Sequence, residues 1–220
     1  MPKIELIIFD FDGVIVDSEA LSSAVHAQTL QQIGVPLTHA DIDKHYTGLD
    51  FASMMQKISA EHGDVKAAAF AATIEANYAQ IMRNELQLMP HIFSFLQTTK
   101  LKFCIGSNSK MQRLKTNQQA TNIDAIFANK TFSADMVANP KPAPDLFLYA
   151  AEKMAVSAKN CVVIEDGAHG IKAASTAGMK SIGFVGGSHC NDGHAQRLLD
   201  AGALQVFSDM RELPKIINNL

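Results

Sequence analysis

The chain has few cysteines, little net charge and no long hydrophobic run. It contains three widely spaced cysteines, and two of them, Cys104 and Cys161, lie inside apolar runs, where they are interpreted as buried side chains. Nothing in this pattern requires disulfide bonds or an oxidising compartment. Lysine and arginine together number 19 and aspartate and glutamate 22, so the formal net charge is −3. A chain with so little charge has no overall field to attract nucleic acid or an anionic membrane.

The composition is typical of a folded globular protein. Hydrophobic residues make up 47% of the 220 residues and charged residues 19%. A chain of this length can bury a substantial core in one or two domains. No apolar run reaches the roughly 18 residues that a membrane-spanning helix needs. The apolar run 4–9 ends at Asp10 and lacks the features of a signal peptide. We therefore expect a cytoplasmic protein with neither a membrane nor a nucleic-acid partner.

Short apolar runs alternate with helical patterns over most of the chain. The runs lie at residues 4–9, 101–106, 161–164, 181–185 and 204–207. Apolar runs without polar alternation are typical of strands that are buried on both faces, as in a parallel sheet. Helix signals separate the later runs, such as Pro144 near a helix start and Gly178 after a helix end. The pattern predicts an α/β fold with a Rossmann-like parallel sheet and helices on both faces.

Residues 17–85 lack any clear strand pattern. Thr38, followed three residues later by Asp41, resembles a capping box, and Gly63 separates two helical segments. We predict that 17–85 forms a small all-helical domain. It would be inserted after the first strand of a core made of residues 1–16 and 86–220.

Two pairs of acidic residues follow predicted strands. Asp10 and Asp12 come directly after the run 4–9, and in extended backbone two residues at this spacing point the same way. Glu165 and Asp166 follow the run 161–164. Open α/β sheets bind ligands at the carboxyl ends of their strands, and carboxylates there suit Mg²⁺. Taken one pair at a time, turn formation or a helix start would explain these residues equally well.

Phosphate-binding groups are expected from two further segments. Ser107 and Asn108 follow the run 101–106, where hydroxyls and backbone N–H groups at a strand-to-helix junction can hold an anion. Lys141 lies between two prolines, and Pro142 favours an extended backbone at the lysine. Taken alone, the serine and asparagine are also ordinary helix caps, and the lysine is also an ordinary surface residue.

Taken together and in this order, these elements resemble the haloacid dehalogenase superfamily. The segments DFDGVIVDSE (10–19), NPKPAPDLF (139–147) and IEDGAHGIKAASTAGM (164–179) carry the resemblance, which covers essentially the whole chain. The helical insertion falls where the β-phosphoglucomutase-like branch of sugar-phosphate phosphatases carries its cap. The resemblance therefore implies a catalytic core with a helical cap that closes over the active site.

The resemblance also implies a role for each matched residue. Asp10 is expected to be the nucleophile that forms an aspartyl-phosphate and also a Mg²⁺ ligand. Asp12 is expected to be the general acid and base, with its backbone carbonyl on the metal. Asp166 would bind the metal, with Glu165 either a direct ligand or a neighbour of the ligands. The expected phosphate-binding residues are Ser107, Asn108 and Lys141, and the expected specificity residues of the cap are Thr47, Gly48, Leu49 and Asp50.

Some positions depart from the family pattern. Ser22 stands where many relatives have a histidine, and the cap loop 46–50 lacks the lysine and arginine with which the mutases bind a second phosphate. Both departures favour a hydrolase over a mutase, and Asp12 counts against a dehalogenase. Gly167 replaces the usual serine or threonine, which we expect to tune rather than abolish activity. The group of His189, Cys190 and His194 matches no zinc spacing, and the flanking residues 186–187 and 191–193 are predicted to form a loop.

The expected function is Mg²⁺-dependent hydrolysis of a small phosphate monoester through an aspartyl-phosphate. A sugar or sugar-acid phosphate, for example one like 6-phosphogluconate, is the expected substrate. A hexose-phosphate mutase is the main alternative, and a non-catalytic binder of phosphorylated metabolites is a lesser one. We expect the phosphorylated small molecule to be the only partner, and the protein to be a monomer or at most a weak homodimer.

Overall fold

The computed structural model describes residues 3–46, 49 and 51–220, and its internal contacts divide the chain into two compact units. The first, which we call the core unit, consists of Met1–Asp17 and Gln87–Leu220. The second, which we call the helical insert, is Ser18–Leu86. No helix in the described part of the chain is long and apolar enough to cross a membrane.

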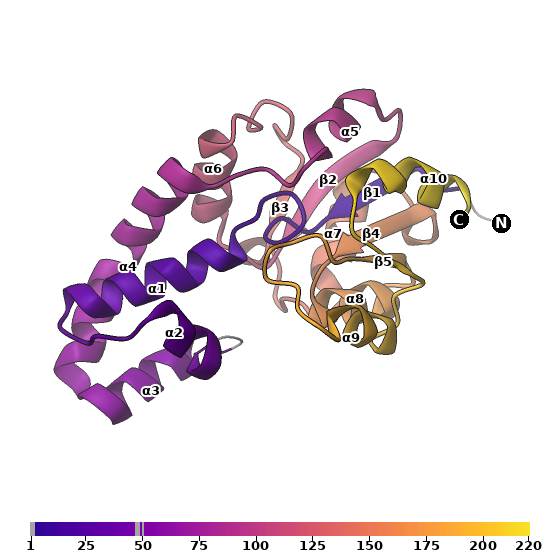
Figure 1. The fold of residues 1–220 in the computed structure, drawn as a ribbon. Helices are drawn as coiled ribbons and strands as arrows, with labels where there is room; N and C mark the ends of the chain where they lie inside the picture. The colour runs from indigo at the N-terminus through magenta and orange to yellow at the C-terminus, as the bar shows by residue number, and fades with distance from the viewer. Residues whose placement is uncertain (1–2, 47–48, 50) are drawn as a thin grey trace. The chain divides into compact units, whose positions relative to one another are not determined.

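The core unit is built on a six-stranded sheet in the order β3-β2-β1-β4-β5-β6 (Figure 1). Every neighbouring pair is parallel, which confirms the predicted α/β fold. The three-residue edge strand β3 was not predicted, because it contains a single large apolar residue, Phe132. The strands are β1 (Leu6–Phe9), β2 (Lys102–Ser107), β3 (Thr131–Ser133), β4 (Cys161–Glu165), β5 (Lys180–Phe184) and β6 (Val206–Phe207).

Helices cover both faces of this sheet. On one face, Leu6 and Ile8 of β1 belong to the same hydrophobic cluster as Phe147 of α7 and Ala173 of α8. On the other face, the ring of Phe9 meets that of Phe95 in α5 edge-on, with centroids 6.1 Å apart. Because successive residues of β1 are buried on opposite faces, its sequence is an unbroken apolar run. The helices of the core unit are α5 (Ile92–Thr98), α6 (Met111–Ala120), α7 (Asp145–Lys153), α8 (Ala168–Thr176), α9 (His194–Asp200) and α10 (Leu213–Asn218), with short 3₁₀ turns at Ala134–Met136, Ala158–Asn160 and Met210–Glu212.

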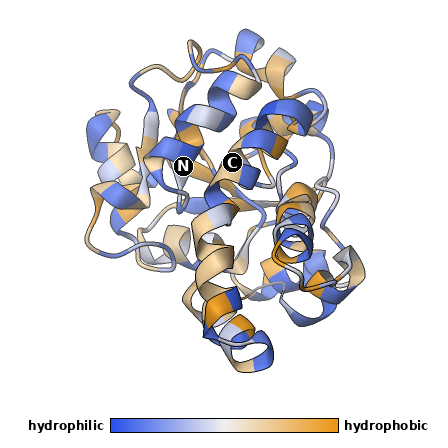
Figure 2. Ribbon diagram, turned by 90° about the vertical axis from the view of Figure 1, so that its left-hand side faces the viewer, coloured by the Kyte–Doolittle hydropathy of each residue, from blue (hydrophilic) through white to orange (hydrophobic). Residues whose placement is uncertain are grey.

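The helical insert follows β1, as predicted, and its described residues form four helices. The capping box forms: the Thr38 hydroxyl accepts from Asp41 N, and Thr38 N donates to the Asp41 carboxylate. The side chain of the buried Asn77 joins two helices by donating to Thr29 and Gln32. The long helices carry both hydrophilic and hydrophobic residues (Figure 2), as expected for helices with one buried side. The four helices are α1 (Glu19–Gln32), α2 (His39–His45), α3 (Phe51–His62) and α4 (Asp64–Glu85).

The chain leaves and re-enters the core unit at one place. Asp17 N donates to Gln87 O at 3.0 Å, and Met89 N donates to Ile15 O at 2.8 Å. Val16 and Leu88 form an antiparallel bridge between these hydrogen bonds. The outgoing and returning segments are therefore paired within the core unit.

Candidate active site

The first part of the site is the segment that follows β1. Asp10 N donates to Ile164 O at 2.8 Å, so the pairing with β4 continues one residue past the strand and fixes the backbone of Asp10. The Asp10 side chain is buried, and that of Asp12 is half-buried. Gly13 follows with φ +76, and a Cβ at this position would overlap the carboxylate of Asp166. A glycine is therefore needed here both for the backbone angle and for space.

The second acidic pair lies beside the first. Phe9 is in register with Ile164, so Asp10 and Glu165 come off adjacent strands at the same edge of the sheet. One carboxylate oxygen from each of Asp10, Glu165 and Asp166 lies within 4.8 Å of the others, and all three side chains are buried. We call these three residues the acidic cluster. Their convergence places three negative groups in a small volume of low dielectric constant.

Lys141 reaches the acidic cluster from the loop before α7. Its Nζ donates to Asp10 Oδ1 at 2.8 Å and to Glu165 Oε2 at 2.9 Å, and only 4% of its side chain is exposed. The ammonium also lies 4.8 Å from the centroid of the Phe147 ring, an arrangement that suits a cation. The lysine that was predicted to bind phosphate is thus a buried cation at the centre of the site.

The side chain of Asn108 holds the Lys141 backbone in place. Asn108 Nδ2 donates to Lys141 O at 3.1 Å, and Asn108 Oδ1 accepts from Lys141 N at 3.0 Å. The peptide bond between Lys141 and Pro142 is cis. The Asn108 side chain thus links the segment after β2 to the loop that carries Lys141, and the expected role of its backbone in phosphate binding stays a prediction.

The pKa values of the cluster reflect burial and crowding. Burial raises the pKa of Asp10 to about 6; Asp166 and Asp12 add to the rise, and Lys141 opposes it. The pKa of Glu165 is likewise raised well above its usual range, first by burial and then by Asp10. Burial lowers the pKa of Lys141, but Asp10 and Glu165 outweigh this effect and hold it above its ordinary value. Burial and crowding therefore favour the neutral forms of the Asp10 and Glu165 carboxyl groups.

Serine residues line the adjoining strand ends. Ser107 is buried at the end of β2, where its hydroxyl accepts from Ser109 N at 3.0 Å. The hydroxyl of Ser109 donates to Asp12 Oδ2 at 2.6 Å, and Ser133 Oγ donates to Ser109 O at 2.7 Å. Ser109 and Ser133 were not predicted as site residues. The signal for Ser109 was its place two residues after β2, at the edge of the sheet that holds Asp10 and Asp12; Ser133 ends β3, a strand that was itself not predicted.

Two glycines at the start of α8 make room for Glu165. Gly167 N donates to Glu165 Oε1 at 3.2 Å, so the backbone at this position supports the carboxylate without a side-chain cap. A Cβ at Gly170 would overlap the carboxyl group of Glu165, although Gly170 lies in a regular helix. Gly170 is a further site residue that the motif alone did not identify.

This close approach predicts the sign of a substitution. An alanine within a helix normally stabilises it by about 0.5–1 kcal/mol relative to glycine. We expect Gly170→Ala instead to destabilise the protein by roughly 1–3 kcal/mol, because the new methyl group overpacks against Glu165. Urea denaturation measures the difference in the free energy of unfolding.

The matched control for this substitution is Gly170→Ala in a Glu165→Ala background. There the overlap is gone, so the added alanine should be neutral or stabilising. A stabilising effect of Gly170→Ala in the wild-type background would show that the close approach to Glu165 does not constrain this position.

Two histidines that were not predicted as site residues, His189 and His194, also reach the site. His189 Nε2 lies 2.9 Å from Asp166 Oδ2, and His194 Nε2 lies 2.6 Å from Asp166 O. Burial lowers the pKa of His189, but its hydrogen bonds with Asp166 and Cys190 outweigh burial and raise the pKa to about 10. Both histidines follow β5, whose carboxyl end lies at the same edge of the sheet as the acidic cluster.

The predicted specificity loop belongs to the helical insert. Leu49 is 38% exposed, and the neighbouring Phe51, at the start of α3, is 53% exposed. Thr47, Gly48 and Asp50 lie outside the described residues. Ser22 is half-buried on α1. The roles of these residues stay predictions.

The acidic cluster has the donor set that a hard divalent cation requires. Carboxylate oxygens are the ligands that Mg²⁺ prefers in proteins, usually one or two of them together with substrate phosphate and water. Three carboxyl groups meet there beside one buried lysine, and a bound cation would offset their charge when they are ionised. The residues present therefore fit a magnesium ion.

Comparisons with known proteins agree with this geometry. The family model of haloacid dehalogenase-like hydrolases matches residues 7–184. The 6-phosphogluconate phosphatase of Escherichia coli (strain K12) is 27% identical over an alignment that covers 98% of this chain and 96% of that protein.

Solved structures show the same fold. A haloacid dehalogenase-like protein of unknown function from Agrobacterium tumefaciens str. C58 has a TM-score of 0.84 and 34% identity, over 98% of both chains. A hydrolase of this family from Deinococcus radiodurans R1, solved with bound phosphate and sodium, has a TM-score of 0.82 and 26% identity, over 100% of this chain and 97% of that one. The chain belongs to the haloacid dehalogenase-like hydrolases, and its fold carries a helical insertion after the first strand.

Proposed function

We propose that this protein is a Mg²⁺-dependent phosphatase that hydrolyses a small phosphate monoester, a sugar or sugar-acid phosphate, with Asp10 as the nucleophile. The observation that carries the proposal is the contact of Asp10 with Lys141 inside the acidic cluster, at the carboxyl end of the central strand. The relative from E. coli named 6-phosphogluconate phosphatase supports a sugar-acid phosphate as the substrate.

Lys141 and Ser107 would bind the phosphoryl group. Lys141 supplies a fixed positive charge, and the Ser107 hydroxyl can donate its hydrogen while its oxygen accepts from Ser109 N. Both groups lie at the edge of the sheet where Asp10 is placed, so a phosphate bound to them is presented to the Asp10 carboxylate. Asn108 contributes by holding the Lys141 backbone.

The side chains of Asp10 and Asp166, with the backbone carbonyl of Asp12, would hold Mg²⁺. When bound, this ion offsets the repulsion between the Asp10 carboxylate and the phosphate and stabilises charge on the transferring group. Glu165 makes different contacts: Oε2 accepts from Lys141 and Oε1 from Gly167 N. We infer that Glu165 positions Lys141 and is a neighbour of the metal ligands rather than one of them.

The proposed reaction has two steps. In the first, an Asp10 carboxylate oxygen forms a bond to phosphorus, the ester P–O bond breaks, and the carboxylic acid of Asp12 gives its proton to the leaving alkoxide. In the second, the Asp12 carboxylate takes a proton from water, the water oxygen bonds to phosphorus, and the bond to Asp10 breaks to release inorganic phosphate. The hydrogen bond from Ser109 Oγ fixes the orientation of the Asp12 carboxylate for both proton transfers.

Phosphate release from a panel of sugar, sugar-acid, polyol and nucleotide monophosphates tests this function. We expect turnover with Mg²⁺, none with a chelator, and the highest kcat/KM for a sugar or sugar-acid phosphate. No release from any substrate would contradict the proposal. Conversion of glucose 1-phosphate in the presence of a bisphosphate would then indicate a mutase, and saturable binding without turnover would indicate a binding protein.

A further inference from the structure

A cavity lies at the amino end of the parallel strands, at the opposite edge of the sheet from the acidic cluster. Its volume is about 510 Å³, within the range of roughly 300–1,000 Å³ that is usual for small-molecule sites. The segments before β1 and β2, the end of α5 and the helix α10 line it, and all of them belong to the core unit (Figure 1). We call it the amino-end cavity. The reaction proposed above makes no use of it.

The amino-end cavity is separate from the active site. Ile4 lines the cavity just before β1, and Asp10 follows the other end of the same strand. At about 3.3 Å per residue of extended chain, the backbone from Ile4 to Asp10 spans roughly 20 Å. A small molecule in the cavity therefore does not reach the residues that we assign to the reaction.

The wall of the cavity is apolar. Ile4, Phe95 and Ile217 line it from three different segments, and their exposed fractions are 5%, 7% and 8%. The ring of Phe95 also meets that of Phe9 edge-on, so this part of the wall is fixed by packing against the central strand. A preformed apolar wall with a few polar groups beside it is typical of a pocket for a small organic molecule.

The lining also carries positive charge, although the chain as a whole is acidic. The formal net charge is −3, yet the described residues that line the cavity include two lysines, Lys3 and Lys100, and no aspartate or glutamate. Both lysines are exposed. Lys102 N donates to Glu5 O at 3.2 Å where β1 and β2 begin to pair, so the segments that carry the two lysines run side by side. One anionic group can therefore approach both of them.

We propose that the amino-end cavity binds a small amphiphilic carboxylate, an apolar chain or ring that carries one carboxylate group. The apolar part would lie against Ile4, Phe95 and Ile217, where it is removed from water. The carboxylate would meet the ammonium groups of Lys3 and Lys100. A neutral apolar molecule would make no use of the two charges, and an anion without an apolar part would gain only weak, solvent-screened ion pairs.

A single introduced tryptophan can report on this cavity. The sequence contains no tryptophan, so Asn218→Trp supplies the sole source of tryptophan fluorescence. Asn218 lines the cavity from the end of α10 and is exposed, so the substitution should leave the fold intact. The probe is octanoate, and the matched neutral ligand is octanamide. The control variant is Val65→Trp, at a position of the helical insert that is 83% exposed.

We expect octanoate to change the emission of Asn218→Trp saturably, with one site per chain, and to leave that of Val65→Trp unchanged. Octanoate should bind at least about threefold more tightly than octanamide, a gain in the range of two exposed ion pairs. Joint replacement of Lys3 and Lys100 by methionine should abolish this preference. Lys172→Met, which changes an exposed lysine of α8 on the other face of the sheet, should keep it. Circular dichroism establishes that each variant is folded.

Saturation-transfer NMR of octanoate with the wild type provides a second measurement, because the introduced tryptophan can itself fill the cavity. We expect transfer from the protein to the octanoate chain. Inorganic phosphate with Mg²⁺ should leave this transfer unchanged, since both are proposed to bind at the active site. The lysine variants are compared by both measurements.

Any of five results would overturn the proposal. Two concern the wild type: no transfer to octanoate, or displacement of octanoate by phosphate and Mg²⁺, which would place it in the active site. A third is transfer that Asn218→Trp neither reports by fluorescence nor blocks. The others are equal binding of octanoate and octanamide, and a preference that survives the loss of both lysines. None of these readouts depends on phosphate release, so the amino-end cavity and the phosphatase function stand or fall separately.

Discussion

Replacement of Asp10 by asparagine should lower kcat for phosphate release by at least about 10⁴-fold, since losses of this size follow removal of a catalytic nucleophile. The carboxamide is not nucleophilic and cannot form the phosphorylated intermediate. Its oxygen can still accept from Lys141, as Asp10 Oδ1 does at 2.8 Å. Because the substitution also removes one charge from the crowded acidic cluster, the metal-free variant should unfold at the same or a higher temperature than the wild type.

Asp12→Asn is the matched control for the nucleophile. With p-nitrophenyl phosphate the leaving group needs no proton, so the first turnover of Asp12→Asn should release p-nitrophenol in a burst, followed by slow steady turnover. Asp10→Asn should give no burst with this substrate. A burst from Asp10→Asn, or steady activity close to that of the wild type, would show that another residue attacks the phosphate.

Replacement of Lys141 by methionine should destabilise the metal-free protein by roughly 3–5 kcal/mol, the usual cost of removing one partner of a buried ion pair. Lys141 donates to both Asp10 and Glu165, and 4% of its side chain is exposed. Methionine has a similar length and can keep the contact with Phe147. The measured loss of stability therefore reports the removal of the positive charge. Urea denaturation in the presence of a chelator measures the change in the free energy of unfolding.

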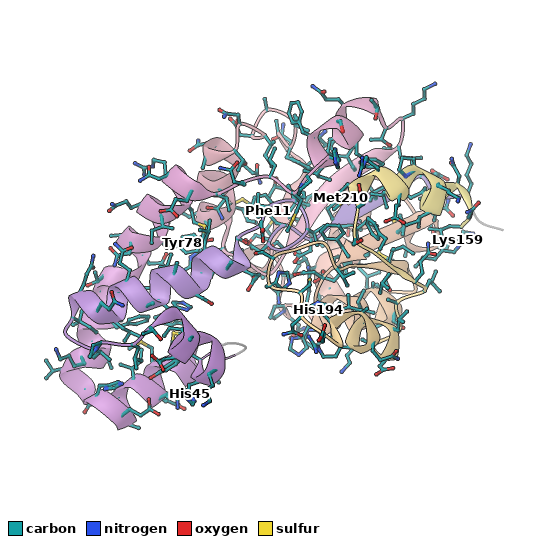
Figure 3. All side chains as sticks on the ribbon, in the orientation of Figure 1. Phe11, His45, Tyr78, Lys159, His194 and Met210 are labelled. Atoms are coloured by element: carbon teal, nitrogen blue, oxygen red, sulfur yellow. The ribbon has the colours of Figure 1, made fainter. Side chains whose placement is uncertain are left out.

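The matched control is Lys159→Met. Lys159 is exposed in a 3₁₀ turn before β4 (labelled in Figure 3), so this substitution should change the free energy of unfolding by less than about 0.5 kcal/mol. Mg²⁺ should restore part of the stability of Lys141→Met, because a bound cation supplies charge to the acidic cluster and stabilises the folded state by mass action. Equal stabilities of the two variants in chelator would mean that the carboxylates are neutral and do not need the lysine.

The parts of the fold that could be predicted depend on local pattern. Unbroken apolar runs identified the central strands, because a strand buried on both faces has no polar positions. The acidic residues after two of those runs were predicted as a site because neighbouring parallel strands end at the same edge. By contrast, β3 has three residues, one of them strongly apolar, and its pairing with β2 forms only through tertiary contact.

The parts of the site that could not be predicted depend on contacts between distant segments. Ser109 and Asp12 are hydrogen-bonded although they lie 97 positions apart in the sequence, and no short sequence motif contains both. Gly170 lies in a helix, where the local sequence would equally allow alanine; only the contact with the Glu165 carboxylate requires glycine. His189 was not predicted as a site residue because its spacing matched no metal motif, yet the segment after β5 brings it to Asp166.

The paired segments around Asp17 and Gln87 have a consequence for how proteins of this kind diversify. The chain leaves and re-enters the core unit through adjacent, hydrogen-bonded residues. The helical insert is therefore joined to the core as a loop is joined to the two strands of a hairpin, and its length has little effect on that junction. A recombination event that swaps this segment leaves the backbone of Asp10 paired with β4 and that of Val16 paired with Leu88. The residues of the core unit can thereby be inherited unchanged while the part of the gene that codes for the helical insert is exchanged whole.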